Sequence, residues 1–257
     1  MPEPHPFGPP NKPIVCLKLG RKAVKTDSRT LRLGAYLTPA LPAPPQAVDW
    51  TKGITSFGEM LNSDLGDCTC AGLGHAVQIW SANTSKEITV PDSAILSAYE
   101  SWCGYNPSDP STDQGGVELD VLTDFRRDGL SGHKLLAFAD PNVSNLDEVR
   151  TAINLFGGIY IGMNVPNFIM DAVPQVWDTV ADDKGIDGGH AVFVTGYDGT
   201  TFTFISWGEV YKMTVPYWDR YVDEAHALIG QDWFETSGVD PTGLNLAQLQ
   251  EDLKAIR

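Results

Sequence analysis

The sequence has no long apolar run, few cysteines and fewer basic than acidic residues. No stretch of about 18 consecutive apolar residues occurs, so the sequence predicts no membrane-spanning helix. The first residues, Met1–Pro6, include no apolar core of a signal peptide, so we do not expect classical secretion. Four cysteines are too few for a disulfide framework, which fits a reducing compartment such as the cytoplasm.

The charges are unevenly distributed along the chain. Lys and Arg number 18 against 33 Asp and Glu, for a net charge of −15. Residues 1–32 hold seven basic and two acidic side chains, so the remainder of the chain is strongly acidic. An acidic body repels nucleic acid, and we expect no nucleic-acid partner for it. The basic segment either contacts phosphates or lies across its own acidic body, and we favour the second interpretation.

Composition indicates a globular chain with three parts. Its 257 residues are 42% hydrophobic and 20% charged, which is typical of folded domains. Residues 1–47 form a basic arm with two proline-rich stretches, and residues 48–225 form the body. Residues 226–257 form an extension, and the leucine spacing within 245–257 predicts an amphipathic helix there.

The hydrophobic periodicity changes midway along the body. Helical spacing is found first, in residues 68–83, 92–103, 118–128 and 145–156. Strand-like patterns follow in residues 159–163, 191–197, 201–205 and 211–215, with a further helix expected over 218–228. Asp198-Gly199 is a hairpin turn signal. We therefore predict an α+β fold, in which a helical half and an antiparallel β half face each other across a cleft.

One cysteine and one histidine stand where nucleophilic chemistry would need them. Cys68 lies at a loop-to-helix junction, where unpaired N–H groups and the helix dipole stabilise a thiolate. His190 follows two glycines at the start of the strongest strand pattern, which would hold an imidazole in a fixed orientation. A thiol needs such a base for its activation.

Four short motifs in order resemble the papain-like cysteine peptidases. They are Gly66-Asp67-Cys68-Thr69-Cys70-Ala71, Gln114-Gly115-Gly116, His190-Ala191-Val192 with Gly196-Tyr197, and Ser206-Trp207-Gly208. The resemblance covers about residues 48–215, and Leu-Gly-Asp-Cys-Thr is similar to a motif of divergent bacterial and phage-encoded proteins. It implies a papain-like fold and a hydrolase, specifically a thiol protease, in which Cys68 attacks and His190 transfers the proton.

The resemblance also assigns the surrounding residues. Asn62 stands where the family has its oxyanion-hole glutamine, and Trp207 would shield His190. Gly115 and Gly116 would line the substrate groove and pair with an extended peptide or protein substrate.

This sequence departs from the family at the residue that orients the histidine. Ile205 stands at the position of the family's asparagine and cannot accept a hydrogen bond. Ser206 and Asp187 are the two possible replacements. The two cysteines of the family's usual disulfide are also absent around Cys68 and Gly116.

Structural interpretations stand beside these assignments. Cys68 could be an ordinary buried thiol and His190 a hydrogen-bonded histidine at a strand end. Cys68-Thr69-Cys70 with His75 lacks the spacing and the second ligand pair of a zinc site, so we expect no metal and no cofactor.

Two functions remain open. The first is a peptidase or related amide hydrolase; the second is a catalytically weak papain-like module with a binding or structural role, for example in a phage particle. We expect a cytoplasmic or phage-associated protein that acts on peptides and does not contact membranes. A third expectation is that the arm lies near the cleft, like a retained prosegment.

Overall fold

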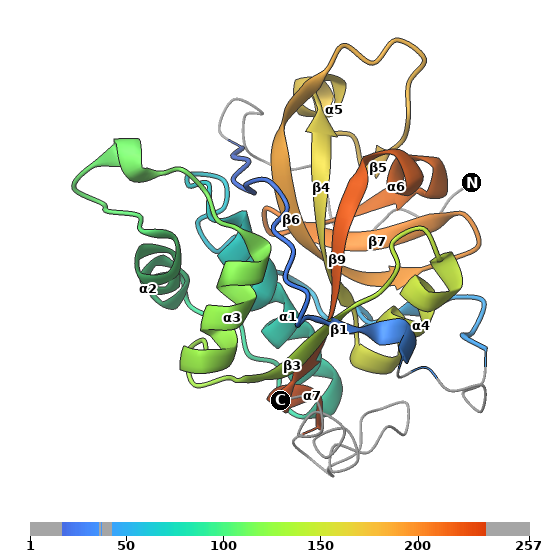
Figure 1. The fold of residues 1–257 in the computed structure, drawn as a ribbon, viewed down its shortest axis with the longest axis horizontal. Coiled ribbons are helices and arrows are strands. Elements are labelled where there is room, and N and C mark those ends of the chain that lie inside the picture. Colours follow the sequence, from blue (N-terminus) through green and yellow to red (C-terminus); the bar gives the residue numbers. More distant parts are fainter. Residues whose placement is uncertain (1–16, 36, 38–42, 235–257) are drawn as a thin grey trace.

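A computed structural model describes residues 17–35, 37 and 43–234 of the 257-residue chain (Figure 1). The proline-rich start of the arm and the amphipathic helix expected over 245–257 lie outside these residues. No helix in the described part of the chain is long and apolar enough to cross a membrane.

Three helices come first in the body and confirm the expected helical half. They are α1 (Cys68–Thr84), α2 (Asp92–Cys103) and α3 (Glu118–Asp128). Helix α1 is buried along most of its length and packs against β6 (Ile186–Tyr197). Trp80 of α1 meets Phe193 of β6 edge-on at 6.0 Å between ring centroids. The helix that begins at Cys68 is therefore anchored directly to the strand that contains His190.

The described residues form one mostly antiparallel sheet in the order β1-β3-β9-β4-β6-β7-β8-β5, with β2 paired to β6. Its strands are β1 (Leu31–Arg32), β2 (Val48–Asp49), β3 (Leu135–Asp140), β4 (Ile159–Pro166), β5 (Val176–Trp177), β6, β7 (Thr201–Ser206), β8 (Glu209–Thr214) and β9 (Val222–Gly230). The remaining helices are α4 (Leu146–Phe156), α5 (Asn167–Ala172), α6 (Val215–Tyr221) and α7 (Gln231–Phe234), with single 3-10 turns at Leu33–Ala35 and Pro110–Thr112. The α+β fold is thus confirmed.

Two tight turns set the register near His190. Asp198-Gly199 lies between β6 and β7, as the turn signal predicts. The next hairpin pairs Ser206 with Glu209 across Trp207-Gly208, both of which have positive φ. That left-handed two-residue turn matches the twist of an antiparallel hairpin, and it places Ser206 and Trp207 at the end of β7.

The helix expected over 218–228 is confirmed only as far as Tyr221, the end of α6. From Val222 the chain is strand β9, which lies between β3 and β4 inside the sheet. Sheet formation therefore continues past residue 225, where the sequence pattern places the end of the body. Buried polar side chains at Glu224 and His226 hide the apolar alternation of this strand.

The described part of the arm lies against the body, as its charge predicts. Figure 1 shows it running between α3 and the sheet before it reaches β1. Strand β1 pairs in parallel with β3. Lys25 contacts Asp120 at 2.6 Å and Arg32 contacts Asp140 at 3.3 Å, so basic arm residues meet acidic body residues.

Candidate active site

The first residue of α1 lies against β6 one residue after His190. Cys68 is the first residue of α1 and is buried. Its Sγ atom accepts a hydrogen bond from the backbone N–H of Ala191 at 3.4 Å. Because Ala191 directly follows His190, the thiol lies beside the strand segment that carries the imidazole.

The His190 ring is held on one side and unpartnered on the other. Its Nε2 atom lies 2.7 Å from Oγ of Ser206, while Nδ1 is buried without a hydrogen-bond partner among the described residues. The indole of Trp207 stacks on the imidazole at 4.7 Å between centroids and 22° between planes. Nδ1 is therefore the ring nitrogen that is free of a hydrogen bond within the described residues.

Of the two residues expected to orient His190, Ser206 is the one in contact with it. Asp187 lies on the same strand but is exposed. Ile205 is buried and pairs with Phe193 of β6. The hydroxyl that contacts the His190 ring therefore comes from Ser206, the residue that follows Ile205 in β7.

Asn62 lies in the loop before Cys68 and is buried. Its amide Nδ2 donates to the carboxyl of Asp67 at 3.2 Å and to the Leu65 carbonyl at 3.4 Å. Burial raises the pKa of Asp67 well above its usual range, against the opposing effect of the Asn62 hydrogen bond. Whether Asn62 also serves an oxyanion stays a prediction.

Burial also governs the titration of the candidate pair. It raises the pKa of Cys68 to about 12, although the backbone N–H groups of Ala191 and Gly20 oppose the change. Burial, followed by the positive charge of Arg21, lowers the pKa of His190 to about 3. In this structure the pair is therefore a neutral thiol and a neutral imidazole.

The arm pairs with the body beside Cys68 and His190 like an added strand. Arg21 forms an antiparallel bridge to Gly189 and a parallel bridge to Gly116. The N–H groups of Gly20 and Arg21 donate to the Gly189 carbonyl at 3.1 and 2.9 Å. Gly116 donates to the Gly20 carbonyl at 2.8 Å and accepts from Lys22 at 2.8 Å. Of the two glycines expected to bind an extended substrate, Gly116 thus pairs with the chain's own arm, whereas the N–H of Gly115 donates to the Tyr99 hydroxyl at 2.8 Å.

Gly20 packs closely against the loop that precedes Cys68. A Cβ atom added at Gly20 would lie 1.8 Å from the Gly66 carbonyl oxygen, two residues before Cys68. Only glycine can approach the loop so closely. Lys18, two residues before Gly20, is fixed as well, because Trp207 Nε1 donates to its carbonyl at 3.2 Å.

The side chain of Arg21 enters a cluster of acidic residues that sequence reasoning missed. Its guanidinium lies 2.9 Å from Asp223, 3.2 Å from Glu224 and 4.0 Å from Glu118; we call these three the acidic cluster. Glu118 opens α3, and Asp223 and Glu224 come from β9. A Glu-x-His spacing on a strand puts both side chains on one face, but the helix expected there concealed this signal.

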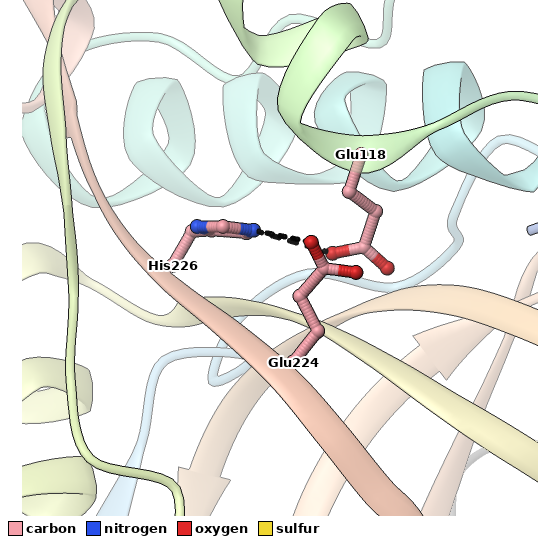
Figure 2. Close-up of side chains that lie close together, drawn as sticks. All are labelled: Glu118, Glu224 and His226. Carbon is pink, nitrogen blue, oxygen red and sulfur yellow. Dashed lines mark hydrogen bonds and ion pairs between the residues drawn. The ribbon is translucent and has the colours of Figure 1, made fainter. Parts of the chain in front are cut away.

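His226 lies behind the acidic cluster, as Figure 2 shows for Glu118, Glu224 and His226. Its Nδ1 is 2.7 Å from Asp140 and its Nε2 is 3.2 Å from Glu224. Burial lowers the pKa of His226, but the hydrogen bonds to these carboxylates outweigh it and raise the pKa to about 9.

Ligand atoms of Glu118, Glu224 and His226 lie within 4.8 Å of one another, a spacing that could hold a metal ion. His226, with a pKa near 9, is protonated at neutral pH, so a metal ion would have to displace that proton. The guanidinium of Arg21 already occupies the carboxylate side of the group. The donor set therefore fits two bound organic cations better than a metal.

Two further described cysteines and His75 are buried or partly buried in the helical half. Cys70 is buried within α1 and Cys103 ends α2; both are free thiols. His75 is buried in α1 with Nε2 2.8 Å from the Gly58 carbonyl oxygen. This contact of His75 with a backbone carbonyl is a packing arrangement.

Neither a protein-family model nor a curated protein sequence matches this chain. Solved structures do match in fold. Xylellain, a cysteine protease from Xylella fastidiosa, has a TM-score of 0.65 and 15% identity over 83% of this chain and 96% of its own.

Two precursor structures are similar as well. Procathepsin L 3 from the larval midgut of Tenebrio molitor has a TM-score of 0.57 and 12% identity, over 84% of this chain and 77% of its own. Procathepsin B S9 of Trypanosoma congolense has a TM-score of 0.58 and 10% identity, over 84% and 87%. The chain therefore has the papain-like α+β fold, as the motif order predicts.

Proposed function

We propose that this chain is a cysteine peptidase or related amide hydrolase in which Cys68 and His190 are the reacting groups. Cys68 Sγ forms a bond to the substrate carbonyl carbon while His190 Nδ1 takes up the thiol proton. The C–N bond then breaks, His190 returns the proton to the leaving amine, and water hydrolyses the thioester.

The observation that carries this proposal is the state of the His190 ring. His75 also has a buried Nδ1 without a partner among the described residues, but its Nε2 contacts only the Gly58 backbone carbonyl. The His190 ring differs because a side-chain hydroxyl and a stacked indole fix it beside a thiol. Here Nε2 is held by Ser206, and the buried Nδ1 has no partner within the described residues. The Cys68 thiol lies against the next residue of the same strand. This arrangement supports a ring poised for proton transfer with the thiol.

The oxyanion would be held at the start of α1. The backbone N–H of Cys68 is among the first of the helix and has no partner within it. Asn62 is the second donor in the proposal, and it would have to turn from Asp67 toward the substrate. An amide donor at 2.7–3.1 Å from the oxyanion is what this chemistry requires.

The arm makes the resting protein latent in this proposal. Residues 18–22 occupy the backbone partners that an extended peptide would need at Gly116 and Gly189. They also remove water from Cys68 and His190, which disfavours the thiolate–imidazolium pair. Displacement of the arm would readmit water, lower the thiol pKa and raise the imidazole pKa.

A papain-like module without catalysis is the second candidate. Ile205 in place of a hydrogen-bonding residue and the neutral state of the buried pair both favour it. In that case the arm would be a permanent part of the fold, and any phage or bacterial role would rest on binding.

Alkylation of Cys68 separates the two functions. Iodoacetamide labelling is followed between pH 5 and 9 by peptide mass spectrometry in the wild type, in His190→Ala and in the arm-displacing variant Gly20→Ala. We expect slow labelling in the wild type and fast labelling at pH 5–6 in Gly20→Ala, which His190→Ala abolishes. An unactivated thiol, with a pKa near 8.5, is almost wholly protonated at pH 5–6.

Peptide turnover completes the test, with Cys68→Ala and Cys70→Ala as a matched pair in the Gly20→Ala background. Both substitutions remove one buried thiol from the first turn of α1. Turnover should disappear in the first and persist in the second. Equal turnover in both, or labelling of Cys68 that ignores His190, would reject the peptidase.

A further inference from the structure

Arg21 is a buried cation whose every close ionic partner belongs to the body. Its side chain is 2% exposed, and it contacts Asp223 and Glu224 within hydrogen-bond distance. Arg21 therefore places a positive charge of the arm at a defined, buried position beside the candidate active site.

The acidic cluster has more binding capacity than Arg21 uses. Glu118 is fully buried, and both of its carboxylate oxygens lack a hydrogen-bond partner among the described residues. Arg21 Nε is 4.0 Å away and is likewise unpartnered there. A buried carboxylate without a partner is costly. Burial accordingly raises the pKa of Glu118, with the nearby charge of Glu224 adding to the effect.

The backbone pairing of the arm shows which residue of an extended chain would place its side chain in the acidic cluster. Arg21 is the residue at which the bridges to Gly116 and Gly189 meet. The residue before it, Gly20, lies against Gly66 and the Cys68 loop. Any chain that pairs with the same two glycines would direct one side chain into the acidic cluster. That residue would be the sequence neighbour of the residue that lies against the Cys68 loop.

Gly162 of β4 leaves the space that the arginine fills. A Cβ atom added there would lie 2.4 Å from Glu118 Oε1 and 2.7 Å from Arg21 Cδ. Next to the cluster, a cavity of about 530 Å³ lies between arm and body; Asp223, Glu224 and His226 are among its lining residues. The cluster therefore borders open space on its Asp223 side, where that side chain is 37% exposed.

We propose that the acidic cluster of Glu118, Asp223 and Glu224 is a specificity site for a basic side chain, arginine or lysine, of the peptide substrate. Arg21 occupies it in the latent protein as an internal stand-in for that side chain. This inference rests on the proposed peptidase function and adds the substrate class. With Arg21 gone, His226 still faces Glu118 and Glu224. Asp140 contacts both His226 and Arg32.

Binding is tested first, without any need for catalysis. Thermal unfolding of full-length Arg21→Ala is measured with increasing ethylguanidinium and, separately, with its neutral isostere N-ethylurea. We expect ethylguanidinium alone to raise Tm saturably, by about 3 °C. The wild type, whose site is filled, and Arg21→Ala/Glu224→Gln should not respond. A second variant, Arg21→Gln, keeps part of the side-chain packing if the alanine variant does not fold.

Specificity is tested next with peptidyl acyloxymethyl ketones that alkylate Cys68. Two matched pairs carry arginine or citrulline at one or the other of the two residues nearest the reactive group. In Arg21→Ala we expect at least tenfold faster labelling by one arginine probe than by its citrulline partner. The additional Glu224→Gln substitution should reduce this ratio toward one.

The outcomes distinguish this inference from the function on which it rests. Equal labelling by arginine and citrulline probes, in a protein whose Cys68 reacts fast at pH 5–6, overturns the specificity site and leaves the peptidase standing. No labelling of Cys68 by any probe or by iodoacetamide overturns both. Absence of a Tm response in both Arg21 variants overturns the specificity site whatever the thiol does.

Discussion

Nε2 of His190 lies 2.7 Å from Oγ of Ser206, a contact that links β6 to the end of β7. A serine hydroxyl can rotate to donate or to accept, so it accommodates either tautomer of the ring. An asparagine carbonyl would only accept. Ser206 therefore fixes where the imidazole lies and leaves its protonation less constrained.

Substitution of Ser206 by alanine should slow the activated thiol without unfolding the protein. In the Gly20→Ala background we expect the alkylation rate of Cys68 at pH 6 to fall about tenfold, as for loss of one positioning hydrogen bond of about 1.4 kcal/mol. Ser206→Thr keeps the hydroxyl and should retain most of the rate. An unchanged pH–rate profile in Ser206→Ala would show that the contact does not orient the ring.

Addition of one methyl group at Gly20 should displace the arm. The new Cβ would meet the Gly66 carbonyl oxygen at 1.8 Å, which no side-chain movement can relieve because both atoms belong to or adjoin the backbone. We expect iodoacetamide to label Cys68 at least tenfold faster in Gly20→Ala than in the wild type.

Gly199→Ala is the matched control for this experiment. It adds the same methyl group at a place where the new Cβ would meet no atom within 4 Å. Its labelling rate should equal that of the wild type. If Gly20→Ala also labels at the wild-type rate, the arm does not control access to the thiol.

The stability of the protein should decrease at alkaline pH because of His226. Its pKa in the folded protein is about 9, above the value near 6.5 expected for the unfolded chain. The native state thus binds the proton more tightly, so the stabilisation is complete below pH 6.5 and is lost as pH rises through 9. The difference corresponds to about 3 kcal/mol in the free energy of unfolding.

Urea unfolding at pH 6, 7, 8 and 9 measures this effect, with His226→Gln for comparison. The variant should be less stable than the wild type at pH 6 and should lose much less stability between pH 6 and 9. Parallel curves for the two proteins would assign the alkaline loss to other groups.

Trp207 connects the arm to the His190 ring. Its indole stacks on the imidazole while Nε1 donates to the Lys18 carbonyl at 3.2 Å. Trp207→Phe keeps an aromatic face and removes the donor, so we expect faster Cys68 labelling of about fivefold, from a lost hydrogen bond of about 1 kcal/mol. A labelling rate that falls below the wild type would indicate that the indole serves His190 more than it holds the arm.

The helical half and most of the sheet could be predicted from sequence because each element shows a clear period. In α3, for example, Leu119, Leu122 and Phe125 share one buried face, as their spacing indicates. The turn at Asp198-Gly199 was predictable for the same reason, since its residue types favour a tight hairpin.

Strand β9 could not be recognised because its buried polar residues satisfy one another across the fold. Glu224 and His226 look like surface residues until Arg21 and Asp140 are placed beside them. Arg21 and Glu224 lie 203 residues apart in sequence, and Asp140 and His226 lie 86 apart, so these pairs leave no local signal. This also explains why the charge of the arm predicted its contact with the body but not the place of Arg21.

The hydrogen bonds of Gly20 and Lys22 to Gly116, with those of Gly20 and Arg21 to Gly189, join the helical half to the sheet through a single strip of backbone. Removal of that strip exposes the Gly116 N–H and the carbonyl oxygens of Gly116 and Gly189, with which another extended backbone can pair in the same way. An incoming chain can therefore displace the resident one step by step. The rate of opening should rise with the concentration of the incoming peptide, so that substrate acts as its own activator.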